Sequence, residues 1–200
     1  MCIRDRIRKA LCAAVARGVV GGVKFDYMPI FTGAQGIGKS TFLSMLGKEW
    51  FSDSLTTFEG KEAAELIQGT WINEVGELTA MTKQETSAVK QFLSKCEDIY
   101  RAAYGRRTEK YPRRCVFFGT SNDSEFLKDA TGNRRFWPVD VGVHPAQRSV
   151  WDDLPQEVDQ IWAEAYTYWM IGEPLYLSKE IEEMAPVSYT HLTLPTKRIV

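Results

Sequence analysis

The segment GAQGIGKS at residues 33–40 constrains the fold most strongly. It follows an apolar, aromatic run, FDYMPIFT at 25–32, and precedes an amphipathic stretch at 41–50. These patterns predict a strand, a glycine-rich loop and a helix in succession. The segment matches G-x-x-x-x-G-K-[ST] in full. Glycines let backbone N–H groups approach a polyphosphate closely, and the following helix adds the positive end of its dipole. The sequence therefore predicts a phosphate-binding loop.

The residue types in this loop predict how a nucleotide binds. We expect ATP with Mg²⁺ as the ligand, because Lys39 would reach the β- and γ-phosphates and the Ser40 hydroxyl would bind the metal. A simple glycine turn before a helix is the alternative interpretation. The residues expected to contact the nucleotide are Gly33, Ala34, Gln35, Gly36, Ile37, Gly38, Lys39, Ser40 and Thr41.

Two glutamates follow the next strand pattern. TWINEV at residues 70–75 predicts a short strand that ends in an acid. An enzyme with a phosphate loop needs one acid to hold the Mg²⁺ shell and usually a second to orient the attacking water. We assign Glu74 to the metal and Glu77 to the water. The reverse assignment stays open, as does a pair of solvated glutamates at a turn.

A third strand pattern, VFFGTSN at residues 116–122, ends in the side-chain amide of Asn122. The unbroken apolar run is typical of a strand covered on both faces. From a strand end, an amide can contact the γ-phosphate or its attacking water, so Asn122 is a candidate sensor residue. A plain Asn-Asp turn is the competing interpretation.

Two adjacent arginines, Arg134 and Arg135, precede Phe136 and Trp137. This arrangement is typical of arginine fingers, which contact the transferred phosphate, and equally of guanidinium groups stacked on core aromatics. We expect Arg134 to be the finger, at the rim of the nucleotide site. Arg135 is expected to pack on one of the two aromatic rings.

Strand patterns alternate with helical patterns along the whole chain. This alternation predicts an α/β fold with three layers and a mainly parallel sheet, as in P-loop NTPases. No internal repeat is visible in the sequence. The helical patterns cover residues 7–20, 41–50, 61–67, 83–94 and 151–171.

The two ends of the chain differ from the rest. Residues 1–6 and 187–200 resemble translated sequencing-adapter text, so we expect both to be non-native; a genuine disordered tail is the alternative for 187–200. The expected ATPase domain therefore covers residues 7–186. It has a core at 20–142 and an acidic, aromatic helical segment at 151–185.

Cysteine and histidine usage excludes a zinc site. The four cysteines form no C-x-x-C pair, and the two histidines, His144 and His191, supply too few ligands. We expect reduced thiols and a cytoplasmic protein. The longest weakly polar stretch, residues 10–23, is interrupted by Arg17 and is shorter than the roughly 18 apolar residues of a membrane span, so neither export nor a membrane partner is expected.

The formal net charge of −1 hides two oppositely charged segments. Residues 101–114 hold six basic residues against one acid, whereas residues 151–185 hold one basic residue against nine acids. The balanced total gives no reason to expect coating by nucleic acid, so any such contact must be local. The acidic segment predicts a packing helix or lid with a solvated face, or a surface for a partner.

Four blocks, GAQGIGKST, WINEVGEL, VFFGTSN and TGNRRFW, together resemble the P-loop domain of the virulence-associated protein E family, found in phages and genomic islands. That domain is similar in layout to superfamily-three viral helicases. The resemblance covers residues 20–142 and implies a helicase, or a primase-associated helicase domain, that forms a homo-oligomeric ring. One departure is that Val75 and Gly76 separate two acids that those helicases keep adjacent.

Residues 90–107 look like the extra motif that those helicases carry between the acid strand and the sensor, where it contributes to a DNA-facing loop. The resemblance therefore implies single-stranded DNA as a partner. A flexible basic loop would contact phosphates without reading sequence, and tyrosines could stack on bases. The residues expected at DNA are Lys90, Arg101, Tyr104, Arg106, Arg107 and Lys110, with Tyr111, Arg113 and Arg114 beside them.

Three other classes of protein share part of this pattern. A small-molecule phosphotransferase has a phosphate loop but no need for a basic stretch between acid strand and sensor. A GTPase normally carries an Asn-Lys-x-Asp base reader, which this sequence lacks. A DNA-binding module with weak or no hydrolysis would be expected to have lost Lys39 or the acids.

Overall fold

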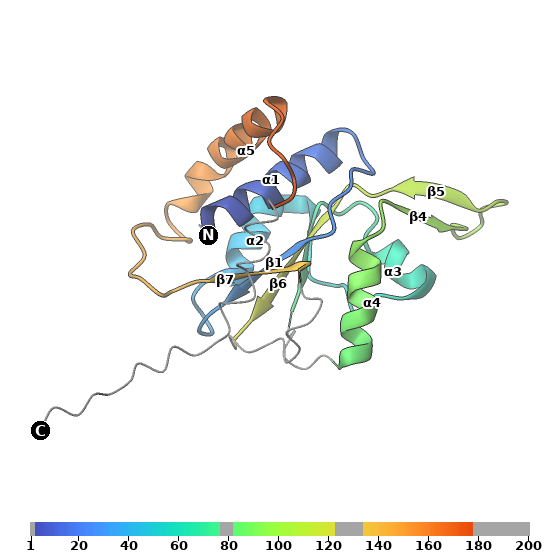
Figure 1. The fold of residues 1–200 in the computed structure, drawn as a ribbon, viewed down its shortest axis with the longest axis horizontal. Helices are drawn as coiled ribbons and strands as arrows, with labels where there is room; N and C mark the ends of the chain where they lie inside the picture. The colour runs from blue at the N-terminus through green and yellow to red at the C-terminus, as the bar shows by residue number, and fades with distance from the viewer. Residues whose placement is uncertain (1–2, 77–81, 123–133, 178–200) are drawn as a thin grey trace, which may run out of the picture.

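A five-stranded parallel sheet forms the centre of the protein, with the strand order β2-β3-β6-β1-β7 (Figure 1). The computed structural model describes residues 3–76, 82–122 and 134–177 of the 200-residue chain. The predicted α/β fold with a mainly parallel sheet is confirmed. The strands are β1 Met28–Thr32, β2 Phe51–Ser52, β3 Ile72–Val75, β6 Val116–Ser121 and β7 Phe136–Asp140.

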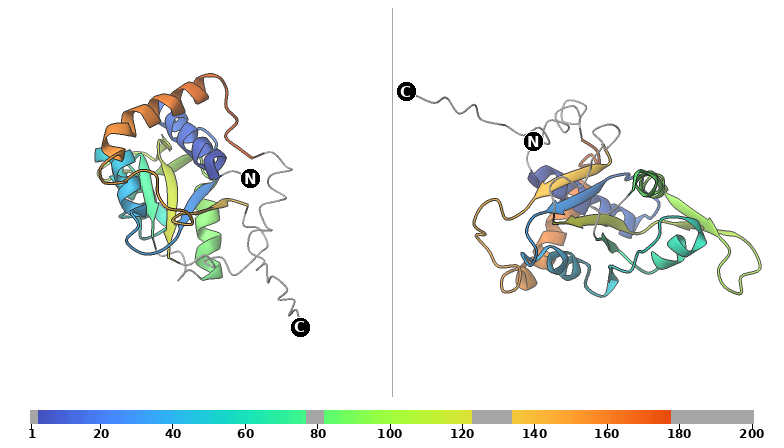
Figure 2. Two further views of the ribbon diagram at one scale, coloured as in Figure 1. Left: turned by 90° about the vertical axis from the view of Figure 1, so that its left-hand side faces the viewer. Right: turned by 90° about the horizontal axis from the view of Figure 1, so that it is seen from below.

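Helices cover both faces of the sheet, which gives three layers. Helices α1 and α2 pack on one face with α5 over them, and α3 and α4 cover the other face. Figure 2 shows α1 and α5 on the side of the sheet opposite to α4. The helices are α1 Ile3–Val19, α2 Lys39–Gly47, α3 Gly60–Leu66, α4 Lys83–Leu93 and α5 Leu154–Met170.

The central strand β6 shows why its sequence is an unbroken apolar run. Successive side chains of a strand point to opposite faces. Val116 and Phe118 therefore pack with α1 and α2, whereas Phe117 packs with α3 and α4, and all three are buried. Burial on both faces leaves no position for a polar side chain until Thr120 near the strand end.

The register of the sheet brings three strand ends together. Thr32 of β1 is paired with Ser121 of β6, and Val75 of β3 is paired with Gly119 of β6. Because the strands are parallel, the loops after them leave from one edge, the usual place of ligand sites in open α/β sheets. The predicted phosphate loop, acid strand and sensor strand therefore end side by side.

Two predicted elements differ from the structure. The helix predicted for residues 41–50 ends at Gly47, where a Cβ atom would lie 2.8 Å from Cβ of Phe51, and a 3₁₀ turn, η1 Lys48–Trp50, continues into β2. The predicted basic loop is confined to residues 101–108, because its flanks pair as an antiparallel hairpin of β4 Glu97–Tyr100 and β5 Glu109–Pro112. This hairpin, residues 97–112, projects from the domain (Figure 1).

Three cysteines lie in the described part of the chain. Cys12, Cys96 and Cys115 are free, and burial raises the pKa of Cys12 and of Cys115 to about 11, so both thiols stay protonated near neutral pH. Among the described helices, none combines the length and apolar character needed to cross a membrane.

Candidate phosphate-binding site

The loop between β1 and α2 is shaped by three glycines. Gly36 and Gly38 have φ values of 81° and 91°, which favour glycine, and a Cβ atom on Gly33 would lie 2.5 Å from the carbonyl oxygen of Val141. Gly38 is also the residue before α2, where no side chain caps the helix. The first N–H groups of α2 therefore remain available to an anion.

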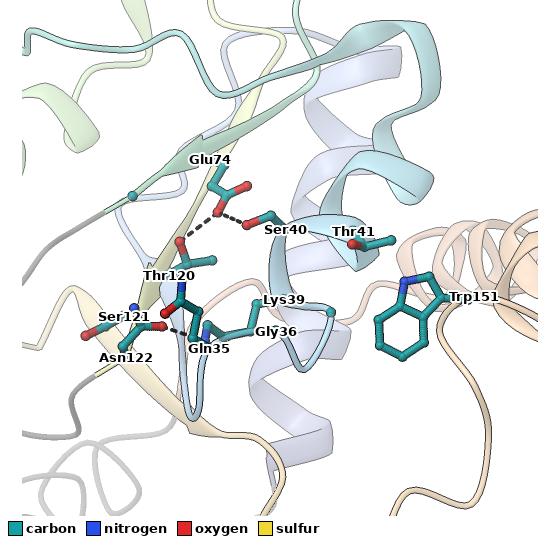
Figure 3. Close-up of a pocket in the computed structure, with 12 residues that line it drawn as sticks. Gln35, Gly36, Lys39, Ser40, Thr41, Glu74, Thr120, Ser121, Asn122 and Trp151 are labelled. Carbon is teal, nitrogen blue, oxygen red and sulfur yellow. Dashed lines mark hydrogen bonds between the residues drawn. The ribbon is translucent and has the colours of Figure 1, made fainter.

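A pocket of about 430 Å³ opens beside this loop, within the size range of small-molecule sites (Figure 3). Its lining comes from the loop, the start of α2, the ends of β3 and β6, and the turn before α5. The lining residues are Gln35, Gly36, Gly38, Lys39, Ser40, Thr41, Glu74, Gly76, Thr120, Ser121, Asn122 and Trp151.

The ammonium group of Lys39 lies across the loop. Its Nζ atom donates to the carbonyl oxygens of Gly33 and Ala34, at 2.7 and 2.9 Å, and to Oδ1 of Asn122 at 3.0 Å. Partial burial lowers the pKa of Lys39, and the carboxylate of Glu74 opposes this shift. All three acceptors are neutral oxygens, so the charge of this lysine is not balanced by them.

Glu74 is the buried acid of the site. Only 5% of it is exposed, and its Oε1 atom accepts hydrogen bonds from the hydroxyl of Ser40 at 2.6 Å and from the hydroxyl of Thr120 at 2.7 Å. Ser40 belongs to α2, Glu74 to β3 and Thr120 to β6. Three separate elements thus place oxygen atoms around one carboxylate beside the phosphate loop.

These oxygens fit a magnesium ion. Mg²⁺ prefers oxygen ligands and is usually held by one or two carboxylates together with substrate phosphates and water. Ser40 and Glu74 supply a hydroxyl and a carboxylate next to the predicted phosphate position. No group of three metal-binding His, Cys, Asp or Glu side chains occurs in the described part of the chain. One hydroxyl and one carboxylate therefore suit a metal ion that is also bound by nucleotide phosphates better than an ion bound by protein ligands alone.

Some of the residues predicted to bind the nucleotide line the pocket, and the others lie elsewhere in the loop. Gln35, Gly36, Gly38 and Lys39 through Thr41 line the pocket. Gly33 and Ala34 face Lys39 through their carbonyl oxygens, and the side chain of Ile37 packs beneath the loop against Gly33. Glu77 lies outside the described residues.

The structure corrects the expected position of Arg134. It stands two residues before Phe136, which pairs with Met28 at the amino end of β1, whereas Asp140 pairs with Thr32 beside the phosphate loop. At about 3.3 Å per residue, Phe136 lies roughly 13 Å from Asp140, and Arg134 precedes Phe136 in a turn. Parallel strands place it at the far edge of the sheet, so it does not lie at the rim of its own subunit's pocket. Its side chain is exposed.

The two aromatic rings that follow Arg135 also contact residues of other elements. The ring of Trp137 stacks on Tyr27 at a centroid distance of 4.4 Å, and the ammonium group of Lys90 lies 5.9 Å from the centroid of Phe136. The Nε atom of Arg135 is buried and has no hydrogen-bond partner.

The residues predicted to bind DNA differ in their surroundings. Arg101, Tyr104, Arg106 and Arg107 are exposed between the two strands, and Tyr104 has a φ of 64°. Lys110 pairs with Glu97 across the strands at 2.8 Å and stays exposed. Lys90 lies apart on α4.

The three neighbouring residues all have partners within the domain, and one of them is buried. Arg113 is buried, binds both carboxylate oxygens of Asp98 and stacks over the ring of Phe92 at 4.0 Å. Tyr111 stacks on Tyr100 at 4.4 Å. Arg114 is hydrogen-bonded to the carbonyl oxygen of Gly18 at 2.8 Å. The expectation that Arg113 contacts phosphates is wrong, because its charge is neutralised inside the domain.

Four pocket residues were not predicted: Gly76, Thr120, Ser121 and Trp151. Thr120 is a polar residue near the end of the apolar run of β6, and that position is the signal that could have identified it. Trp151 comes from the turn before α5 and follows no motif, so only the folded chain brings it to the loop.

The fold and this loop define a class: α/β proteins with a parallel sheet and a glycine-rich loop between a strand and a helix at its carboxyl edge. The model of the virulence-associated protein E-like domain matches residues 2–191, and the chain belongs to this family. The family resemblance predicted from the four sequence blocks is thereby confirmed.

Two solved structures share the fold. The A form apo structure of the NrS-1 C-terminal region matches with a TM-score of 0.55 at 12% identity, over 90% of this chain and 46% of that one. A second apo structure of the same region matches with a TM-score of 0.50 at 14% sequence identity, over 92% of this chain and 47% of that one. This chain thus spans about half the length of each. The comparison with curated proteins finds no match.

Proposed function

We propose that the chain is the Mg²⁺-dependent ATPase domain of a phage or mobile-element replication protein that acts on single-stranded DNA. The observation that carries this proposal is the convergence of Lys39, Ser40, Glu74, Thr120 and Asn122 beside an uncapped helix N-terminus. A lysine, a hydroxyl, a buried acid and an amide around a glycine loop are the parts that phosphoryl transfer from a nucleotide requires. Membership of the virulence-associated protein E-like family supports the replication role.

Each group has a distinct task. The N–H groups at the start of α2 and the Lys39 ammonium bind the phosphates, and Lys39 exchanges its bonds to the loop carbonyls for phosphate oxygens. When bound with the nucleotide, Mg²⁺ supplies charge neutralisation of the phosphates, and Ser40 and Glu74 are the residues that hold it. Thr120 orients the Glu74 carboxylate through its hydrogen bond.

The attacking water needs a positioning group on the far side of the γ-phosphate. Asn122 accepts a hydrogen bond from the Lys39 ammonium group and directly follows the central strand β6. This position suits contact with the γ-phosphate or its attacking water. Glu77 follows Glu74 by three residues and remains the proposed activator of the water. Exchanged roles for the two acids remain the alternative assignment.

Subunit assembly would complete the site. Arg134 is exposed at the edge of the sheet opposite to the phosphate loop, so it cannot serve its own pocket. In a homo-oligomeric ring the same arginine can reach a neighbour's nucleotide, which makes hydrolysis depend on assembly. The exposed arginines of the hairpin supply sequence-independent contacts to DNA phosphates.

The deciding experiment measures phosphate release from ATP by the full chain, with Mg²⁺ or with EDTA, and with or without single-stranded DNA. We expect Mg²⁺-dependent hydrolysis that DNA stimulates and that Lys39→Ala removes. DNA binding without hydrolysis would contradict the ATPase and support a non-hydrolysing DNA-binding module. Transfer to a small acceptor without any effect of DNA would support a phosphotransferase instead.

A further inference from the structure

The pocket has two chemically different ends. Glu74, Ser40 and Asn122 lie at one end, and the indole of Trp151 lies at the other, beyond Thr41 (Figure 3). Among the described residues that line the pocket, Trp151 supplies the aromatic ring. A nucleoside triphosphate has the same polarity, because its charged phosphates and its aromatic base are at opposite ends.

Trp151 is held in place by its neighbours and not by its own burial. Val150 packs against the cluster formed by α1, α2 and α5, which anchors this segment to α2. The backbone N–H of Trp151 donates to the hydroxyl of Ser149, and the N–H of Ser149 donates to the carboxylate of Asp153 at 2.7 Å. Trp151 itself remains 56% exposed. The chain therefore fixes the backbone at Trp151, whose indole contributes little to the core.

The indole lies directly beside the phosphate loop. A Cβ atom built on Gly38 would be 3.5 Å from Cζ2 of Trp151, so the edge of the ring lies close to the residue that precedes α2. The N–H groups available to phosphates begin at the same place. A nucleotide whose phosphates occupy the loop thus brings its sugar and base into reach of the exposed indole face.

We propose that Trp151 is the stacking platform for the purine base of the bound nucleotide. This inference rests on the proposed function and names the part of the site that recognises the nucleoside. Stacking on an indole uses the π-face that every base has, so Trp151 adds affinity for nucleotides over free polyphosphate without selecting adenine over guanine.

The test compares Mg-ATP with Mg-tripolyphosphate, which has the phosphates and no base, in equilibrium binding to the full chain. Trp151→Ala should weaken ATP binding about ten-fold and leave tripolyphosphate binding within about two-fold, and Trp151→Phe should recover most of the ATP affinity. Trp50→Ala is the matched control, because Trp50 is 49% exposed and lines a different pocket.

Other outcomes overturn the inference. Unchanged ATP affinity in Trp151→Ala would place the base elsewhere, and an equal loss for both ligands would show that Trp151 only supports the loop. Wild-type protein that binds tripolyphosphate and ATP equally would exclude a base site while leaving the phosphate loop intact. Wild-type protein that binds neither ligand would contradict the proposed function itself, together with the role of Trp151.

Discussion

The ammonium group of Lys39 donates a 3.0 Å hydrogen bond to the side-chain oxygen of Asn122, 83 residues later in the chain. This bond joins the phosphate loop to the end of the central strand β6 across the mouth of the pocket. The remaining two bonds of the ammonium group go to carbonyl oxygens of the loop itself. The positive charge is therefore oriented before any ligand arrives.

Lys39→Ala should abolish hydrolysis and weaken Mg-ATP binding, because it removes the point charge aimed at the transferred phosphate. Loss of a comparable transition-state donor costs about 10²–10³ in kcat. Steady-state phosphate release and equilibrium nucleotide binding measure the two effects. Lys48→Ala is the control, since Lys48 follows the same helix and pairs with Asp159 at the surface. Equal activity in the Lys39 and Lys48 variants would contradict the assigned role.

Glu74→Gln and Glu77→Gln should separate metal binding from water activation. We expect Glu74→Gln to weaken Mg²⁺-dependent ATP binding, because Glu74 is hydrogen-bonded to Ser40 at 2.6 Å beside the loop. Glu77→Gln should spare binding and stop turnover. Binding titrations at several Mg²⁺ concentrations, followed by single-turnover hydrolysis, distinguish the two effects. The opposite pattern would reverse the assignments, and unchanged hydrolysis in both variants would refute the acid-strand interpretation.

The hairpin arginines should determine the salt dependence of DNA binding. Replacing Arg106 and Arg107 by Ala removes two exposed cations between the strands. The slope of log affinity for single-stranded DNA against log salt should flatten by roughly 0.7 per lost phosphate contact. Lys48→Ala with Arg148→Ala provides a control with the same loss of charge elsewhere on the surface. Equal flattening in both double variants would show that DNA does not bind specifically at the hairpin.

Arg113 and Asp98 should matter for stability. Their side chains are 0% and 1% exposed and form two hydrogen bonds, of 2.7 and 2.9 Å. Arg113→Ala would leave the carboxylate of Asp98 buried without a partner, which typically costs about 3–5 kcal/mol. Urea unfolding measures the change in the free energy of unfolding. A double variant, Arg113→Met with Asp98→Leu, should lose less, and a larger loss there would contradict this account.

Arg134 should act on a neighbouring subunit. We expect Lys39→Ala and Arg134→Ala to be inactive separately and to recover part of the hydrolysis when mixed under conditions where the wild type assembles. Recovery is expected because some interfaces then pair an intact phosphate loop with an intact arginine. Native mass spectrometry of the mixture verifies co-assembly. Co-assembly without recovery would indicate a structural role for Arg134.

Much of the site was predictable because its signals are local. The loop, the acid strand and the sensor strand each occupy fewer than about ten consecutive residues, and strand and helix periods show within such windows. The hairpin was missed for the opposite reason. Its strands are short and mixed in polarity, and the buried ion pair of Arg113 and Asp98 at its base is not visible in a linear pattern.

By itself, the sequence determined the α/β class and a glycine-rich loop between a strand and a helix, and it identified Lys39, Ser40, Glu74 and Asn122 as candidate site residues, because residue type and period report local structure directly. The tertiary structure alone decided which groups meet. Strand order and register bring Thr120 to Glu74, carry Arg134 to the opposite edge of the sheet, and bury Arg113 while its neighbours stay exposed. The turn before α5 likewise brings Trp151 to the loop. Such contacts depend on how distant segments pack together, and no short stretch of sequence encodes them.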